Sequence, residues 1–406
     1  MRAKYFLNLV LIVVVGMTAF LSHPSQVLAQ SPTGSTTTGV ASKPVTAKNN
    51  LKVFEVVWST INKEYYDDDF NGVDWAKSRE RFQPRAAAAT TEKELYELLR
   101  DMVAELKDNH VSVKSPEVAQ LLKRRAFPNI GAEFRRIDQQ VLVTEVKVPS
   151  SASEAGIQPG WILTSVNDVP VEKLDGFSGE VGETLRFKFL DQTDNPRDIS
   201  LNVKYLATTP IQTARLLEKN VLYVRFDRFE ENTGKWFQAV LAQNEMASGL
   251  IVDLRRNLGG LVSTVRQCLE VLSAEDVAVG EFIERSGKEK IFRISGKGKR
   301  AWNKPVVVLI DKYSASGSEI LAAALQEAGR GKVIGRPSAG AVLASIKKDL
   351  PDGGELQYSI RDFLTVRKAR LEGHGVKPDE VIELSVNAVR QKSDQDVARA
   401  LEILGQ

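Results

Sequence analysis

The segment "VVVLIDKYSASGSEILAAALQEAG", residues 306–329, decides the fold class of the chain. Five consecutive apolar residues predict a buried strand, a polar turn follows, and a stretch rich in alanine and leucine predicts a helix. Upstream, "VLYVRFDRF" (221–229) and "SGLIVDLR" (248–255) also predict buried strands, and helical patterns separate them. Strands that alternate with helices are typical of a partly parallel sheet covered by helices. We therefore expect an α/β core over residues 207–406.

The residues before this core follow two other patterns. Residues 49–124 contain "LKVFEVVWSTINKEYY" and "TTEKELYELLRDMVAELKD", in which apolar residues recur every three or four positions. The second stretch opens with a threonine that can cap a helix. Residues 125–206 contain short strand-like runs such as "QQVLVTEVKV" and "ETLRFKFLD". The sequence therefore predicts a multidomain α/β protein, with a helical part and a small β domain ahead of the core.

The first residues have the pattern of a targeting signal. Arg2 and Lys4 precede the apolar run "YFLNLVLIVVVGMTAFL", and "VLA" before Gln30 fits a cleavage site with small residues. We expect a signal peptide over residues 1–29, although a membrane anchor is the alternative. Residues 30–48, rich in serine, threonine, glycine and proline, predict a flexible linker. The chain is therefore expected to be exported, to a periplasmic or extracellular location, without a membrane span after cleavage.

Composition restricts the partners and cofactors. Lysine and arginine are spread along the chain and number 55 against 52 acidic residues, so no nucleic-acid surface is expected. Cys268 is the only cysteine and cannot form an internal disulfide. After removal of the signal peptide only His110 and His374 remain, and no metal-ligand spacing is present. We expect neither a metal nor another cofactor.

The turn before the helix of the opening segment contains three serines, Ser314, Ser316 and Ser318. A side chain in the first turn of a helix lies at the positive end of the helix dipole, where free N–H groups can hold an anion. A serine there can act as a nucleophile, since the same N–H groups stabilise the oxyanion of an acyl transfer. An ordinary N-cap serine is the alternative reading of this segment alone.

A second turn, "DLRRNLGGL", contains Gly259 and Gly260. Adjacent glycines allow backbone N–H groups to approach a ligand closely. This turn could complete an oxyanion hole, or it could be a plain turn between a strand and a helix.

Taken together, "DLRRNLGG", "YSASGSEILAAALQEAGRGKVIG" and "GHGVKPDEVI" resemble the C-terminal processing, or tail-specific, serine proteases and their relatives, the tricorn protease core and the retinoid-binding repeats. "IGAEF" with "SSASEAGIQPGWILTSVNDVPV" resembles the PDZ domain of those proteases. The resemblance extends from Asn49 onward. It implies a PDZ-like domain over residues 125–206 and a protease core of the ClpP/crotonase-like type.

In the processing branch of this family the nucleophile is the middle serine of a "SASAS"-like run, which corresponds to Ser316. Its proton acceptor there is a lysine, but the matching position in this chain is Ala341. Lys347 and Lys348 follow six and seven residues later and are poor replacements.

The tricorn-like branch implies a different base. Its histidine comes from the helical part, and "LKDNHVSV" places His110 there. A neutral imidazole can accept a serine proton at neutral pH. Glu372 matches the supporting glutamate of that branch, which acts through a small polar residue at the position of Asn109. Asp108 could orient the ring instead or cap a helix, and His374 is the second candidate base.

The resemblance also implies the remaining site residues. The turn of Gly259 and Gly260 and the N–H of Gly317 would supply the oxyanion donors. A backbone nest around Ile130 and Gly131 would hold the terminal carboxylate of a peptide.

The sequence thus predicts an exported serine endopeptidase that selects protein or peptide substrates by their free C-termini. A non-catalytic protein on the same scaffold, binding a peptide or a lipophilic ligand, is the alternative that Ala341 favours. A hydrolase of small esters is a third reading.

Overall fold

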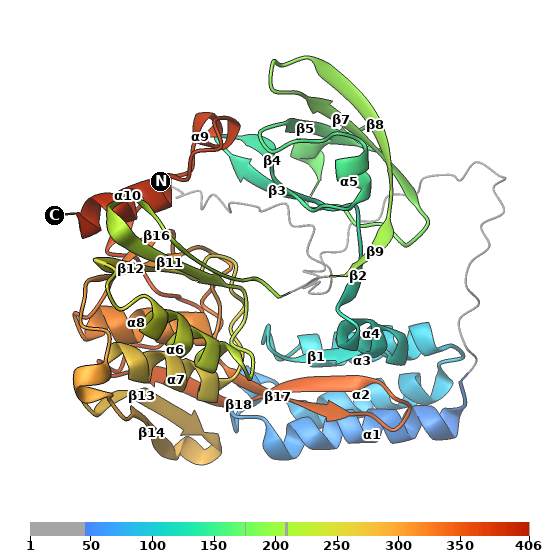
Figure 1. Ribbon diagram of the computed structural model, residues 1–406. Coiled ribbons are helices and arrows are strands. Elements are labelled where there is room, and N and C mark those ends of the chain that lie inside the picture. The colour runs from blue at the N-terminus through green and yellow to red at the C-terminus, as the bar shows by residue number, and fades with distance from the viewer. Residues whose placement is uncertain (1–44, 175, 208–209, 406) are drawn as a thin grey trace, which may run out of the picture.

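The computed structural model describes residues 45–174, 176–207 and 210–405. The predicted signal peptide and most of the predicted linker lie outside the described residues. The first helix begins at Ala47, so the predicted linker overlaps it by two residues. Figure 1 shows three parts: a helical module (blue), a β domain (green) and an α/β core (yellow to red). The expected multidomain α/β fold is confirmed.

The helical module forms because capped amphipathic segments bury one face of each helix. The side chains of Thr46, Asp74 and Thr91 each accept an N–H from the first turn of the helix that follows. Its helices are α1 (Ala47–Glu64), α2 (Trp75–Ala88), α3 (Glu92–Ala104) and α4 (Pro116–Lys123).

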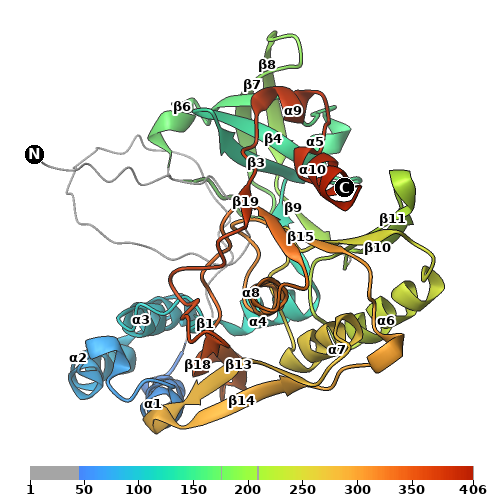
Figure 2. The same ribbon diagram turned by 90° about the vertical axis from the view of Figure 1, so that its left-hand side faces the viewer.

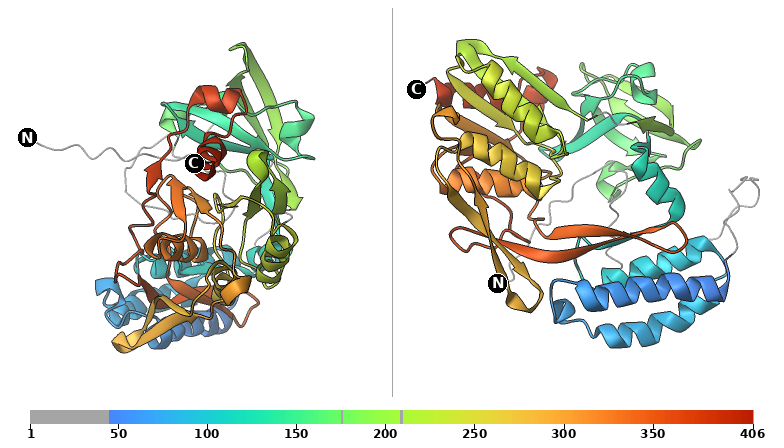
Figure 3. Two further views of the ribbon diagram at one scale, coloured as in Figure 1. Left: turned by 60° about the vertical axis from the view of Figure 1, so that its left-hand side comes forward. Right: turned by 60° about the horizontal axis from the view of Figure 1, so that its bottom comes forward.

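The hydrophobic core of this module is completed by a hairpin from the other end of the chain. The hairpin of β17 (Ala344–Asp349) and β18 (Glu355–Thr365) contributes Leu350 from its turn and Leu356 and Tyr358 from β18. Figure 3 (right) shows this hairpin extending from the core over the helices. The helical module is therefore anchored to the core by burial of apolar surface.

The β domain is a twisted antiparallel sheet around an aromatic core. Phe134, Phe187 and Phe189 stack with ring centroids 5.9–6.4 Å apart, and the Trp161 ring meets Phe189 edge-on. The sheet order is β3-β4-β5-β7-β8, with β6 paired to β5. Its elements are β3 (Ala132–Ile137), β4 (Gln140–Val146), α5 (Ser151–Glu154), β5 (Ile162–Val166), β6 (Val169–Pro170), β7 (Thr184–Leu190) and β8 (Pro196–Asn202). The ribbon of β2 (Ala126–Asn129) and β9 (Lys204–Ala207) connects it to the rest.

The core contains a six-stranded sheet in the order β10-β11-β12-β15-β16-β19, parallel except for β10. Its strands alternate faces: Leu222 and Val224 point to one side, and Val221 and Tyr223 to the other. These strands are β10 (Gln212–Leu216), β11 (Val221–Phe226), β12 (Gly249–Asp253), β15 (Val306–Ile310), β16 (Lys332–Gly335) and β19 (Glu380–Val381).

Helices cover both faces of this sheet. The helices α6 (Thr233–Gln243), α7 (Val262–Leu272) and α8 (Gly317–Glu327) pack on one face, between the sheet and the strands β13 (Val277–Glu284) and β14 (Glu289–Ile294) (Figure 1). The second sheet has the order β1-β18-β13-β14, in which β1 is Ser112–Lys114, with β17 paired to β18. Short 3-10 turns are η1 (Phe70–Gly72), η2 (Val171–Lys173), η3 (Glu218–Asn220), η4 (Arg285–Gly287) and η5 (Gly298–Arg300).

The C-terminal segment joins the β domain to the core. The helix α9 (Val386–Arg390) packs its valines on Ile137, Leu142 and Ile162 of the β domain. The helix α10 (Gln395–Leu404) covers the other face of the six-stranded sheet (Figure 2). In the part of the chain that the structure describes, no helix has the length and apolar character needed to cross a membrane.

Candidate active site

The candidate nucleophile lies where strand β15 turns into helix α8. Ser316 is the N-cap of α8, is half-buried, and has φ 54° and ψ −115°. Such a backbone conformation costs a non-glycine residue about 1–3 kcal/mol, so the surrounding structure must enforce it.

Two neighbouring serines enforce this turn. The Ser314 hydroxyl donates to the Leu254 carbonyl at 2.8 Å, and the Ser318 hydroxyl donates to the Asn257 carbonyl at 2.9 Å. Both are fully buried. They bind the serine turn to the loop after β12, which contains the two predicted glycines.

The two glycines differ in what their N–H groups can do. The Gly259 N–H donates to the Asn257 side chain at 2.9 Å, so it is not free to bind an oxyanion. For the Gly260 and Gly317 N–H groups, no hydrogen bond is found among the described residues. A Cβ on Gly317 would lie 3.6 Å from the Gly260 nitrogen, so these two groups lie close together. The geometry supports Gly260 and Gly317 as the donor pair, and Gly259 as the residue that leaves room for Ser316.

A buried carboxylate that the sequence analysis missed supports the nucleophile turn. Glu319 accepts hydrogen bonds from the Ser316 N–H (2.9 Å), the Ala341 N–H (2.9 Å), the Gly340 N–H (2.8 Å) and the Ser338 hydroxyl (2.6 Å). Burial raises the pKa of Glu319, although these hydrogen bonds act in the opposite direction. The Ser316 N–H also donates to the Ala341 carbonyl at 2.7 Å. The loop that contains Ala341, which stands at the position of the lysine in the processing branch, is therefore held to the nucleophile turn by hydrogen bonds of its backbone. The Ser-x-x-Glu pattern of a capping box was the available signal.

The candidate base lies between α3 and β1 (Ser112–Lys114), and β1 pairs with β18 in the second sheet. His110 is 9% exposed. Its backbone N–H donates to Asp108 at 2.7 Å, and the Tyr65 hydroxyl donates to the other oxygen of Asp108 at 3.0 Å. Asp108 therefore holds the backbone of His110 and does not orient its ring. Asn109, the expected relay, is exposed, and the Glu372 carboxylate approaches the His110 ring without it.

Glu372 contacts the imidazole directly. Its Oε2 lies 3.7 Å from Nε2 of His110, and the same oxygen accepts the Val342 N–H at 2.7 Å and the Leu343 N–H at 3.2 Å. The His110 Nε2 is buried and has no hydrogen-bond partner among the described residues. Since Val342 follows Ala341, Glu372 connects His110 to the loop that is bonded to Ser316.

The other candidate bases are engaged elsewhere. His374 is exposed, and its Nδ1 lies 2.9 Å from the Glu372 carbonyl oxygen. Lys347 pairs with Glu355 at 3.0 Å, and Lys348 pairs with Glu64 at 3.4 Å.

The predicted carboxylate nest in the β domain is occupied by the protein itself. The Gly131 N–H donates to the Asn129 side chain at 2.6 Å, and the Ile130 carbonyl accepts the Ala152 N–H at 2.9 Å. A Cβ on Gly131 would lie 2.1 Å from the Ser150 Cβ, so that space is filled as well. Ile130 and Gly131 do not present a free N–H pair as the sequence analysis expected.

For the residues described, no group of three or more His, Cys, Asp or Glu side chains is arranged to hold a metal ion. The candidate site itself is made up of the Ser316 hydroxyl, the His110 imidazole, the Glu319 and Glu372 carboxylates and the Gly260 and Gly317 N–H groups.

Comparison with known proteins gives matches over most of the chain. Residues 220–382 match the model of peptidase family S41, and residues 47–104 match the tricorn protease C1 domain. The chain is 27% identical over 369 residues to a carboxyl-terminal-processing protease of Synechocystis sp., covering 86% of this chain and 85% of that protein. It is 26% identical over 370 residues to one of Picosynechococcus sp., covering 86% and 88%.

The fold is also similar to solved structures. The photosystem II D1 C-terminal processing protease superposes with a TM-score of 0.59 at 22% identity, covering 88% of this chain and 97% of that one. The tricorn protease superposes with a TM-score of 0.51 at 16% identity, covering 88% of this chain and 36% of that one. The stretch matched by the peptidase model contains Ser316, Gly260 and Glu372, and the tricorn C1 match covers the helices that precede His110.

Proposed function

We propose that this member of peptidase family S41, a C-terminal processing serine protease, uses Ser316 as its nucleophile and His110 as its general base. One observation carries the proposal: the Glu372 carboxylate contacts the His110 ring and also binds the loop that is bonded to the Ser316 backbone. A carboxylate on one ring nitrogen stabilises the imidazolium that forms when the other nitrogen accepts a proton.

The reaction then follows the acyl-transfer sequence of serine hydrolases. The Ser316 oxygen attacks the peptide carbonyl while His110 accepts the hydroxyl proton. The Gly260 and Gly317 N–H groups stabilise the oxyanion, and each such donor contributes about 3 kcal/mol to transition-state stabilisation. His110 gives the proton to the leaving amine. Water then attacks the ester, with His110 again as base, and releases the acyl product.

The substrate and the location belong to the same proposal. The relatives are named as carboxyl-terminal-processing proteases, which supports protein substrates cleaved near their C-termini. The β domain, with its predicted PDZ-like character, is proposed to select the tail by adding it as a strand. The N-terminal signal pattern supports export. N-terminal sequencing of the secreted protein should find Gln30 as the first residue, and retention of Met1 would contradict cleavage of a signal peptide after Ala29.

Labelling with a fluorophosphonate probe tests the nucleophile, because the probe reacts only with an activated serine. Trypsin should release the labelled peptide Tyr313–Arg330, and fragmentation should place the adduct on Ser316. His110→Ala should abolish labelling, whereas the matched variant His374→Ala should keep it. A folded wild-type protein that remains unlabelled would contradict the proposal and favour a non-catalytic binding protein.

A further inference from the structure

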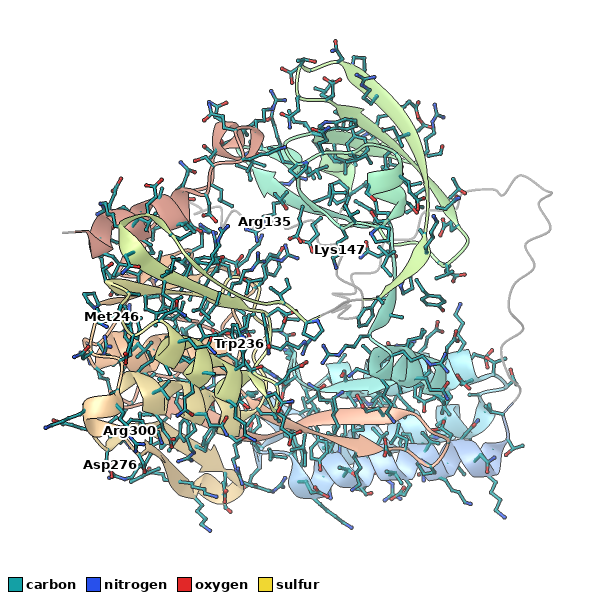
Figure 4. The ribbon with its side chains drawn as sticks, viewed as in Figure 1. Arg135, Lys147, Trp236, Met246, Asp276 and Arg300 are labelled. Atoms are coloured by element: carbon teal, nitrogen blue, oxygen red, sulfur yellow. The ribbon has the colours of Figure 1, made fainter. Side chains whose placement is uncertain are left out.

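A cluster of cations surrounds one aromatic ring beside the nucleophile turn. Lys312 lies four residues before Ser316, and its Nζ is 5.2 Å from the ring centroid of Tyr313. The guanidinium groups of Arg135 and Arg256 lie 5.4 and 5.3 Å from the same ring. Arg135 belongs to β3 and reaches from the β domain toward the core (Figure 4). The cluster therefore lies where the β domain meets the active-site loops.

The arginines of this cluster have carboxylate partners. Arg135 donates to Asp311 at 2.8 Å, and Arg256 pairs with Glu133. The other oxygen of Asp311 accepts hydrogen bonds from the backbone N–H groups of Arg256 and Tyr313. Nearby, Arg336 donates to Asp396.

Lys312 differs from these arginines. It has no ion pair and no hydrogen bond to any residue that the structure describes. Asp311, the nearest carboxylate in sequence, is already bonded through both oxygens. The positive charge of Lys312 is therefore available to an anion from outside the chain.

Burial and the neighbouring cations disfavour the protonated form of Lys312 in the free protein. Burial, followed by the nearby Arg135, lowers the pKa of Lys312 to about 8, and Asp311 only partly opposes this. The charged and titratable groups around the ammonium group are Asp311, Arg135, Arg256, Arg336 and Tyr313, and Glu133 acts on the neighbouring Tyr313. An arriving anion would relieve the repulsion between these cations.

We propose that Lys312, with Arg135 and Arg256 beside it, forms a subsite for a carboxylate of the bound polypeptide, an inference that rests on the proposed protease function. The nest at Gly131 is closed, so the β domain offers no free N–H pair there for this charge. Lysine and arginine bind carboxylates through charge-assisted hydrogen bonds. The carboxylate is either the free C-terminus of the substrate or an acidic side chain near it.

Binding to the full-length Ser316→Ala variant tests this subsite without requiring cleavage. Three fluorescent peptides of one apolar sequence are compared by anisotropy: one with a free C-terminus, one amidated, and one amidated with a glutamate near its end. The second variant carries Lys312→Met in the same background. The control carries Lys147→Met, which removes a half-buried lysine from the same side of the β domain as Arg135 (Figure 4).

We expect Lys312→Met to weaken binding of a carboxylate-bearing peptide about tenfold and to leave the amidated neutral peptide unchanged. Whichever peptide shows the loss, free C-terminus or glutamate, identifies the source of the carboxylate. Affinity for that peptide should fall as the pH rises through about 8, and this dependence should be absent in Lys312→Met.

Equal weakening of all three peptides, or a selective loss in Lys147→Met alone, would overturn the subsite. Failure of the protease mechanism would instead appear as absence of probe labelling in the wild type, which leaves these binding measurements intact.

Discussion

The Oε2 atom of Glu372 lies 3.7 Å from Nε2 of His110, although 262 positions separate the two residues in the sequence. This carboxylate is 15% exposed and is held by two backbone N–H groups, so its position does not depend on the histidine. The imidazole is therefore placed against a fixed negative charge, as expected for a base that becomes positively charged during the reaction.

Glu372→Gln should lower kcat by about 10- to 100-fold with little change in KM, because the amide oxygen can still accept the Val342 N–H but the negative charge is lost. Steady-state kinetics on a peptide substrate measures this. The double variant with His110→Ala should be no slower than His110→Ala alone. Independent, multiplicative losses would show that Glu372 does not act through His110.

Gly259→Ala should abolish activity, because its Cβ would lie 2.6 Å from the Ser316 Cβ and 2.8 Å from the Gly317 nitrogen. Gly353→Ala is the matched control: its φ of 93° is close to the 84° of Gly259, but the nearest atom to its Cβ is 3.8 Å away. Both variants should lose about 1–2 kcal/mol of unfolding free energy from backbone strain. An active Gly259→Ala enzyme would contradict the close packing of the Gly259 turn against Ser316 and Gly317.

Tyr65→Phe should reduce kcat, because it removes the hydroxyl that donates to Asp108, the residue that fixes the His110 backbone. Tyr96→Phe is the control, because Tyr96 is a buried tyrosine of the same helical module whose hydroxyl donates to Asp352 and not to Asp108. Each substitution should cost about 1–2 kcal/mol of stability in urea unfolding. The role assigned to Tyr65 fails if the two variants have the same kcat.

Asp311→Asn should be less stable than the wild type by roughly 3–5 kcal/mol at neutral pH, because Arg135 is left without its partner. Burial opposes ionisation of Asp311, but Arg135 and two backbone N–H groups hold its pKa below the ordinary 3.8. The folded protein therefore binds this proton less tightly than the unfolded chain, and the stabilisation present above about pH 4 is lost as the pH falls through the folded-state pKa.

Urea unfolding of both proteins at pH 7, 5 and 3.5 measures this difference in stability. The difference in unfolding free energy between the two proteins should be smaller at pH 3.5 than at pH 7. A gap of constant size across the series would show that the ionisation of Asp311 does not contribute to it.

Much of the core could be predicted from local patterns. The apolar runs that became β11, β12 and β15 and the helices between them are recognisable because strand and helix periods differ. The second sheet could not be predicted, since its pairing of β1 with β18 joins residues far apart in the sequence, which periodicity does not record. The attachment of the helical module to the β17–β18 hairpin could not be predicted for the same reason, because it also joins residues that are far apart in the sequence.

The site shows a similar division. The serine turn and the glycine turn are local, so their places in the sequence could be expected from residue type, but the positive φ of Ser316 is imposed by contacts that are distant in sequence. Whether an individual N–H group is free depends on neighbouring side chains. The Asn257 side chain accepts the Gly259 N–H, and the Asn129 side chain accepts the Gly131 N–H. Glu319 carried a capping signal, but its bonds to the 338–341 loop depend on the folded arrangement.

The pairing of Ser112 with Gln357 has a consequence for biosynthesis. While the ribosome is still adding residues to the growing chain, the strand beside His110 has no partner, so the imidazole has no defined position. Contacts this distant in sequence form late and slowly during folding. On the proposed mechanism, the nascent polypeptide therefore has a serine without its base until β18 has been synthesised and has paired with β1.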